Sequence, residues 1–145
     1  QAAGIPIVAS RDWHPADHCS FSDRDGPWPG HCVREPAGAA FHPDLRLPRD
    51  AIIISKGRDR DRDNYSAFDD TGLADRLRRL GVERLFVGGL AQDVCVQATV
   101  LDACEAGFET RLIRNATRAV DVSPGDGDRA LEAMRAAGAR IEDSA

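Results

Sequence analysis

The sequence predicts an α/β fold with a mostly parallel sheet, because short apolar runs alternate along the chain with segments of helical periodicity. Each apolar run is continuous, which is typical of strands that are covered on both faces. The segments between the later runs repeat apolar residues every three to four positions and end at glycines. Alternation of this kind favours parallel strands that are joined by helical crossovers.

Five apolar runs are interpreted as strands, and three amphipathic patterns as helices. The strands are expected at residues 5–9, 51–54, 85–87, 111–113 and 139–141. The helical patterns end at Gly81, Gly107 and Gly138. The segment 12–50 has little periodicity and much Pro, Gly, Asp and His. A loop of that length inside a compact domain usually carries function.

Composition narrows the class of protein. The chain has 145 residues, 42% of them hydrophobic and 30% charged, which suits one globular domain. A net charge of −5 argues against nucleic acid or an anionic membrane as a partner. No apolar run approaches the roughly 18–20 residues of a membrane span, and no secretory signal is visible. The four cysteines form no CxxC pair, so we expect free thiols in a cytoplasmic protein.

An alternating run of arginine and aspartate occupies residues 58–63. Alternating opposite charges are typical of a solvated surface segment, and they carry no recognisable ligand-binding pattern. We therefore interpret the run as an exposed loop rather than as a binding motif.

The turn at residues 88–99 is the strongest chemical signal. The apolar run 85–87 leads into Gly88 and Gly89, and Cys95 then opens a helical pattern. Backbone N–H groups and the helix dipole stabilise a thiolate at such a place, and they can also hold an oxyanion. A chain with such a turn is a candidate cysteine hydrolase. The alternative is a small buried thiol that only packs.

Other reactive side chains follow two neighbouring strands. Asp12 and His14 come after the first strand, and Lys56 ends the second. Ligands bind open α/β sheets at the carboxyl ends of the strands, so these groups and Cys95 should converge. Asp12 and His14 point to the same side of an extended segment and can share a zinc, iron or manganese ion. The alternative is that His14 and the nearby His18 and His31 only form hydrogen bonds that hold the loop together.

In their order along the chain, these motifs resemble the nicotinamidase branch of the isochorismatase-like cysteine hydrolases. The resemblance covers nearly the whole chain and implies a three-layer α/β/α domain with a mostly parallel central sheet. The matching segments are 12–21 (DWHPADHCSF), 28–32 (WPGHC), Lys56, 65–68 (YSAF), 88–96 (GGLAQDVCV), 107–110 (GFET) and 116–120 (ATRAV).

The resemblance implies roles for the residues of the turn. Cys95 would be the nucleophile and Lys56 a member of the catalytic triad. The peptide bond between Leu90 and Ala91 would be cis. The N–H groups of Ala91 and Cys95 would then point to one place and form an oxyanion hole.

It also implies one divalent metal ion and an aromatic pocket. Asp12, His14 and His31 would bind the metal, while His18 matches a position that is a ligand in some relatives and not in others. The pocket residues would be Trp28, Tyr65 and Leu90. From the residues alone, ordinary loop packing is the better explanation for Trp28 and Tyr65.

The implied reaction is hydrolysis of nicotinamide to nicotinate and ammonia through a cysteine acyl-enzyme, as part of NAD salvage. The metal would hold the pyridine nitrogen. The substrate would be a small molecule, no nucleic acid or membrane would be a partner, and homo-oligomerisation is left open. The alternatives are an amidase of the same superfamily with a different small substrate, and a non-catalytic binding module.

One family feature has no counterpart in the sequence. The family's triad aspartate ends a first strand, whereas this chain begins with residues 1–4, which resemble the tail of the following helix. A strand and its helix span roughly 30 residues. We therefore expect residues 1–145 to be a single domain whose N-terminal part lies outside the printed sequence, rather than a naturally short protein. If the chain is complete as printed, we expect it to be unstable and inactive alone.

Overall fold

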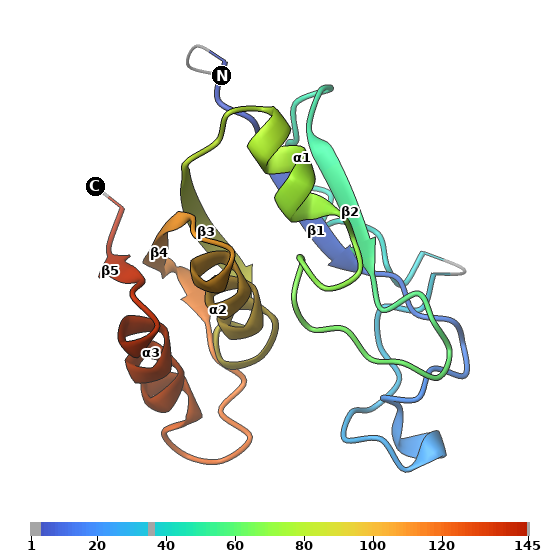
Figure 1. The fold of residues 1–145 in the computed structure, drawn as a ribbon. Coiled ribbons are helices and arrows are strands. Elements are labelled where there is room, and N and C mark those ends of the chain that lie inside the picture. The colour runs from blue at the N-terminus through green and yellow to red at the C-terminus, as the bar shows by residue number, and fades with distance from the viewer. Residues whose placement is uncertain (1–3, 35–36, 145) are drawn as a thin grey trace. The chain divides into compact units, whose positions relative to one another are not determined.

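The computed structural model describes residues 4–34 and 37–144. The chain divides into two compact units, Gln1–Asn64 and Tyr65–Ala145. Figure 1 shows the course of the chain through both units.

The first unit is built on two parallel strands, β1 (Val8–Asp12) and β2 (Ile52–Lys56). Val8 lies opposite Ile52, and the pairing ends with Asp12 opposite Lys56. The other described residues of the unit lie outside these strands, mostly in loops, and they include the 3-10 turn η1 (Ser22–Arg24). Parallel pairing therefore brings both carboxyl ends to one edge of the sheet.

The first strand does not occupy the predicted residues 5–9. It begins at Val8, and Ile5 is 63% exposed outside it. The strand instead continues through polar residues, because Arg11 is held against β2 by a hydrogen bond from its Nε to Ser55 Oγ (3.1 Å). The Arg11 guanidinium also lies 3.9 Å from the centre of the Trp13 ring. Apolarity alone cannot detect a strand extended in this way.

The second unit alternates helices with parallel strands. It contains α1 (Leu73–Arg79), β3 (Arg84–Leu90), a π-helical turn η2 (Gln92–Val96), α2 (Gln97–Glu105), β4 (Glu109–Arg118), α3 (Asp126–Ala136) and β5 (Arg140–Glu142). The strand order is β3-β4-β5, and both pairings are parallel. The three predicted helices and the parallel α/β character are confirmed. No helix of the described residues is long and apolar enough to cross a membrane.

The core of the second unit lies between the sheet and its helices. Its buried members come from η2, α2, β4, α3 and the start of the last strand: Val96, Val100, Leu112, Ala130, Met134 and Ala139. Leu112 and Met134 are fully buried. This packing holds η2 and the start of α2 against the sheet. The cysteine turn lies in η2.

The described strands form two sheets rather than one. Among the described residues, β1 pairs only with β2, and β3 pairs on one side only, with β4. On β3, Phe86 is 60% exposed and Leu90 is 74% exposed. The continuous apolar run at 85–87 is therefore not covered on both faces within the described chain.

A ladder of ion pairs crosses the three strands of the second unit. Glu109 on β4 contacts Arg84 on β3 (2.8 Å) and Arg111 on its own strand (3.0 Å). Arg111 in turn contacts Glu142 on β5 (3.3 Å). The hydrogen bonds from Arg84 and Arg111 lower the pKa of Glu109 from 4.5 to about 2.

Replacement of Glu109 by Gln should therefore lower stability in a pH-dependent way. A carboxylate with a lowered folded-state pKa stabilises fully above pH 4.5, and the effect is lost as the pH falls through about 2. Denaturant unfolding should show a small wild-type advantage at neutral pH that shrinks on acidification and in high salt, because the group is exposed. Glu132→Gln is the control, since Glu132 has no ion pair among the described residues. An advantage that is constant with pH would contradict this account.

Candidate active site

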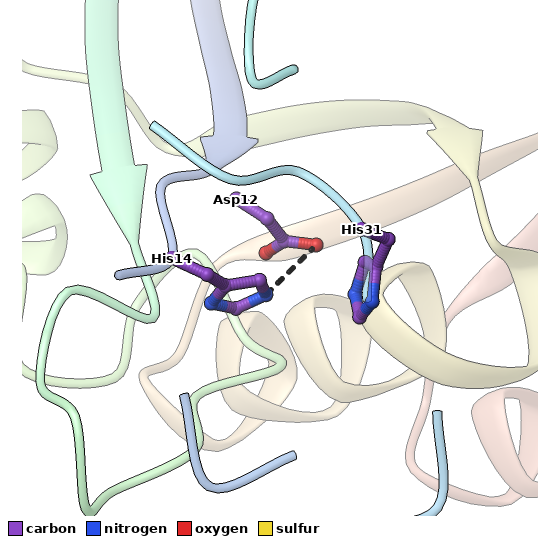
Figure 2. A group of neighbouring side chains, drawn as sticks. All are labelled: Asp12, His14 and His31. Carbon is purple, nitrogen blue, oxygen red and sulfur yellow. Dashed lines mark ion pairs between the residues drawn. The ribbon is translucent and has the colours of Figure 1, made fainter. Parts of the chain in front are cut away.

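Asp12, His14 and His31 form a compact group in the first unit. One ligand atom from each residue lies within 4.8 Å of the others. Figure 2 shows the Asp12 carboxylate beside both imidazoles. Asp12 ends β1, and the two histidines come from the loop that follows it. The predicted proximity of Asp12 and His14 is thus confirmed.

Both imidazoles are oriented by backbone carbonyl groups. His14 Nδ1 lies 2.8 Å from the Gly57 carbonyl oxygen, and His31 Nδ1 lies 2.8 Å from the Pro29 carbonyl oxygen. A carbonyl oxygen can only accept, so Nδ1 carries the proton in each ring. The lone pair is then on Nε2, and His14 Nε2 lies 3.9 Å from Asp12 Oδ2. This is the arrangement in which histidines bind metal ions.

The His14 ring is kept neutral by burial. Only 2% of the residue is exposed, and desolvation lowers its pKa below 6.5. The hydrogen bond to Gly57 and the charge of Asp12 act in the opposite direction but do not overcome the desolvation. A neutral imidazole is the form that coordinates metals.

The donor set fits a divalent transition metal. One carboxylate oxygen and two imidazole nitrogens suit zinc, iron or manganese. Three protein ligands also leave coordination positions for a further ligand, as catalytic sites require.

Lys56 lies beside this group. Its Nζ donates to Asp12 Oδ1 (2.5 Å) and to the Asn64 carbonyl oxygen (3.3 Å), and the residue is only 5% exposed. The two oxygens of Asp12 thus face different partners, the ammonium on one side and His14 on the other. The β1–β2 register places Lys56 here, as the strand-end argument predicts.

His18 is close to the group but faces other partners. The residue is fully buried, its Nδ1 lies 2.7 Å from Ser20 Oγ, and its Nε2 lies 3.2 Å from the Arg62 carbonyl oxygen. Its ring stacks on His14 with centroids 4.0 Å apart. His18 therefore supports the His14 ring, and we do not include it in the proposed ligand set.

Cys95 lies in the second unit, within η2. The helical conformation begins at Gln92, three residues before the cysteine that was expected to open it. It begins there because the Ala91 carbonyl oxygen accepts from the N–H groups of Val94 (3.2 Å) and Val96 (3.0 Å). The peptide bond between Leu90 and Ala91 is cis, which confirms the expectation. Cys95 is half-buried.

Two side chains of η2 anchor the cysteine turn. Gln92 is buried, and its amide joins the turn to α3 by donating to the Gly127 carbonyl oxygen (3.0 Å). Its Oε1 accepts from Thr117 Oγ1 on β4 (2.9 Å). Asp93 accepts from the N–H groups of Val120 (2.9 Å) and Asp121 (2.8 Å). No pattern in the sequence marks Gln92, but a buried amide needs partners of this kind.

The remaining predicted residues are divided between the units. Trp28 is half-buried in the first unit, near His31 in the chain, and Phe21 pairs with it in an isolated bridge. In the second unit, Tyr65 is 36% exposed and Leu90 is 74% exposed. That these residues, Ala91 and Cys95 meet the Asp12 group stays a prediction.

Replacement of Gly57 by Ala should weaken metal binding. A Cβ atom at Gly57 would lie 2.3 Å from His14 Cε1 and 2.5 Å from Nδ1, at a φ of +60° that disfavours a side chain. We expect a loss of affinity of about 10-fold or more, as is usual when the partner of a metal-binding histidine is disturbed. Competition of zinc between the protein and a chelator measures this.

Gly30→Ala is the matched control for this experiment. A Cβ atom at Gly30 meets nothing within 4 Å, although the residue is next to His31. Equal zinc affinity in the two variants would contradict the role of Gly57.

Comparison with known proteins now identifies the family. The Isochorismatase domain family matches residues 1–145. A nicotinamidase from Escherichia coli is 38% identical over 97% of this chain and 76% of its own length. A nicotinamidase/pyrazinamidase from Mycobacterium tuberculosis is 36% identical over 93% of this chain and 75% of its own length.

Solved structures agree with the sequence comparison. The pyrazinamidase of Pyrococcus horikoshii in complex with zinc superposes with a TM-score of 0.90 and 48% identity, over 97% of this chain and 76% of that one. PnC1 from L. infantum in complex with nicotinate gives a TM-score of 0.89 at 39% identity, over 95% and 71%. The chain is therefore a member of the isochorismatase family of hydrolases.

Proposed function

We propose that this protein hydrolyses nicotinamide to nicotinate and ammonia, with Cys95 as the nucleophile and a divalent metal ion on Asp12, His14 and His31. The observation that carries the proposal is the group of one carboxylate and two Nε2-facing imidazoles. It is supported by relatives named as nicotinamidases or pyrazinamidases, one of them in complex with zinc.

The metal centre would orient the substrate. When bound, the metal supplies a Lewis-acid position for the pyridine nitrogen of nicotinamide. The hydrogen bonds at Nδ1 leave the Nε2 atoms of His14 and His31 available to the metal. Lys56 binds one oxygen of Asp12, and the other oxygen can then coordinate the metal. A ring held at its nitrogen presents the carboxamide at a fixed distance and direction. Binding would therefore also determine where the reacting carbon lies.

The side chains expected to line the pocket are apolar or aromatic. Trp28 belongs to the loop that carries His31, while Tyr65 and Leu90 belong to the second unit. Tyr65 and Leu90 are both open to solvent in the structure, so an aromatic ring that bound against them would cover apolar surface. We propose these three residues as the walls of the pocket.

The chemistry would take place at Cys95. Its thiolate attacks the amide carbon, and the C=O bond opens to an oxyanion. The N–H groups of Ala91 and Cys95 are proposed as donors to that oxygen, each worth about 3–4 kcal/mol in other hydrolases. The proton that leaves the Cys95 thiol passes to the amide nitrogen, so collapse expels ammonia and leaves a thioester, which water hydrolyses to nicotinate.

We also propose the cytoplasm as the location of this reaction. Among the described residues, no disulfide joins the cysteines Cys19, Cys32, Cys95 and Cys104. A nucleophilic thiol and three further thiols suit a reducing compartment. There, hydrolysis of nicotinamide would serve NAD salvage.

Replacement of Cys95 by Ala should abolish the release of ammonia from nicotinamide while leaving bound zinc unchanged. The reason is that the nucleophile is lost but the ligands of the other unit are not touched. Cys104→Ala, in the adjoining helix, is the control and should keep turnover. A Cys95 variant with a tenth of wild-type turnover or more would contradict the proposed mechanism.

Replacement of His14 by Ala should remove the metal and the preference for a pyridine ring. Elemental analysis should show loss of zinc, and the KM for nicotinamide should rise while that for benzamide, which lacks the ring nitrogen, changes little. His42→Ala is the control, because the His42 imidazole is exposed and, among the described residues, its hydrogen bond and ion pair are with Asp44 alone. Full metal occupancy in the His14 variant would contradict the ligand assignment.

A further inference from the structure

The Arg–Asp run 58–63 is mostly exposed, as the sequence predicts, but it also contacts another segment of the chain. Its backbone and side chains contact the segment 17–24, which belongs to the loop between Asp12 and His31. The N–H of Cys19 donates to the Arg60 carbonyl oxygen (2.8 Å), and Arg60 Nε pairs with Asp17 Oδ2 (2.6 Å). The interpretation of the run as a merely solvated loop is therefore incomplete.

Arg24 bridges the two segments. Its Nη1 donates to the carbonyl oxygens of Asp17 (3.0 Å) and Arg60 (3.2 Å), and its Nη2 donates to Asp61 Oδ1 (2.9 Å). One acceptor lies in its own segment and two lie in the run. A planar guanidinium can make such a set of bonds at once, whereas a lysine ammonium is a point charge on a flexible stem. We call the four residues Asp17, Arg24, Arg60 and Asp61 the Arg24 clasp.

The segment held by the clasp touches the candidate metal centre at two places. The Gly57 carbonyl, just before the run, orients the His14 ring directly. The Arg62 carbonyl, within the run, contacts Nε2 of His18, whose ring stacks on His14 at 4.0 Å. Residues 57–62 therefore hold His14 both by a hydrogen bond and through the His18 ring.

The three histidines of this loop have two different roles. His14 and His31 offer Nε2 atoms to a metal, while His18 uses both ring nitrogens on protein partners. That use requires the Arg62 carbonyl to stay in place. The run follows the end of β2, and the contacts of Arg24 and Arg60 hold it against segment 17–24.

We propose that Arg24 is a positioning residue for the metal centre: through the clasp it holds residues 57–62 against segment 17–24 and so fixes the His14 ring. The inference rests on the proposed function, since it concerns the same metal ligands. It assigns a role to the Arg–Asp run, which the reaction itself does not use.

The test is metal affinity in the full protein. Arg24→Ala should weaken zinc binding by about 10-fold, in the range found when the support of a metal ligand is removed. Arg24→Lys should recover only part of the loss, because an ammonium cannot reproduce the fork. Arg58→Ala is the matched control: Arg58 is in the same run but has no hydrogen bond or ion pair among the described residues. It should bind zinc as the wild type does.

Hydrogen exchange of the metal-free protein gives a second readout. The Cys19 amide, which donates to Arg60, should lose protection in Arg24→Ala and keep it in Arg58→Ala. If Arg24→Ala does not fold by circular dichroism, Asp61→Ala removes one acceptor of the same fork and should shift both readouts in the same direction by less.

The outcomes separate this inference from the proposed function. A wild-type protein that binds no divalent metal would overturn the proposed function. A wild type that binds zinc, with unchanged affinity in Arg24→Ala, would overturn the role of Arg24 alone. Loss of Cys19 protection without any change in zinc affinity would also overturn it, because the clasp would then be structural only.

Discussion

The candidate metal centre depends on the parallel pairing of β1 with β2. The register places Asp12 opposite Lys56, so a carboxylate and an ammonium meet where both strands end. A slip of one residue would turn Asp12 to the other face of the sheet and separate it from both Lys56 and His14. Because the two residues are 44 positions apart in the chain, only this pairing brings them together.

Around this pair, the loops supply backbone carbonyls rather than further charged groups. Gly57 and Pro29 each accept from an Nδ1–H group and leave the opposite nitrogen for a metal. Carbonyl partners orient the rings without adding negative charge beside Asp12. The absence of a side chain at Gly57 is part of this arrangement, since the His14 ring occupies the space of a Cβ atom.

The cysteine turn is held in place mainly by two of its own side chains. It is anchored by the buried amide of Gln92 and the carboxylate of Asp93, which reach β4, the loop after it and α3. No buried side-chain polar atom of the described residues is left without a partner. A turn that is tied down from several elements keeps Cys95 and its neighbouring N–H groups in place, as a preorganised oxyanion site would require.

Local pattern predicted much of the fold. The helices of the second unit repeat apolar residues on one face over several turns, and that signal is strong enough to place them. The apolar pattern predicts the first strand three residues too early, at 5–9, because Ser10 and Arg11 are polar. Their place in β1 depends on bonds to β2. A partner on another strand cannot be read from local composition.

The sequence by itself determined which chemical groups are present and that Asp12, His14 and Lys56 lie at the ends of strands, because strand ends and residue types are local properties. Only the tertiary structure decided the roles of Gly57, His18, Gln92 and Arg24. Their partners lie far away in the chain: His14 meets Gly57 across 43 positions, and Gln92 meets Gly127 across 35. Hydrogen bonds and steric fit over such separations arise only when the chain is folded.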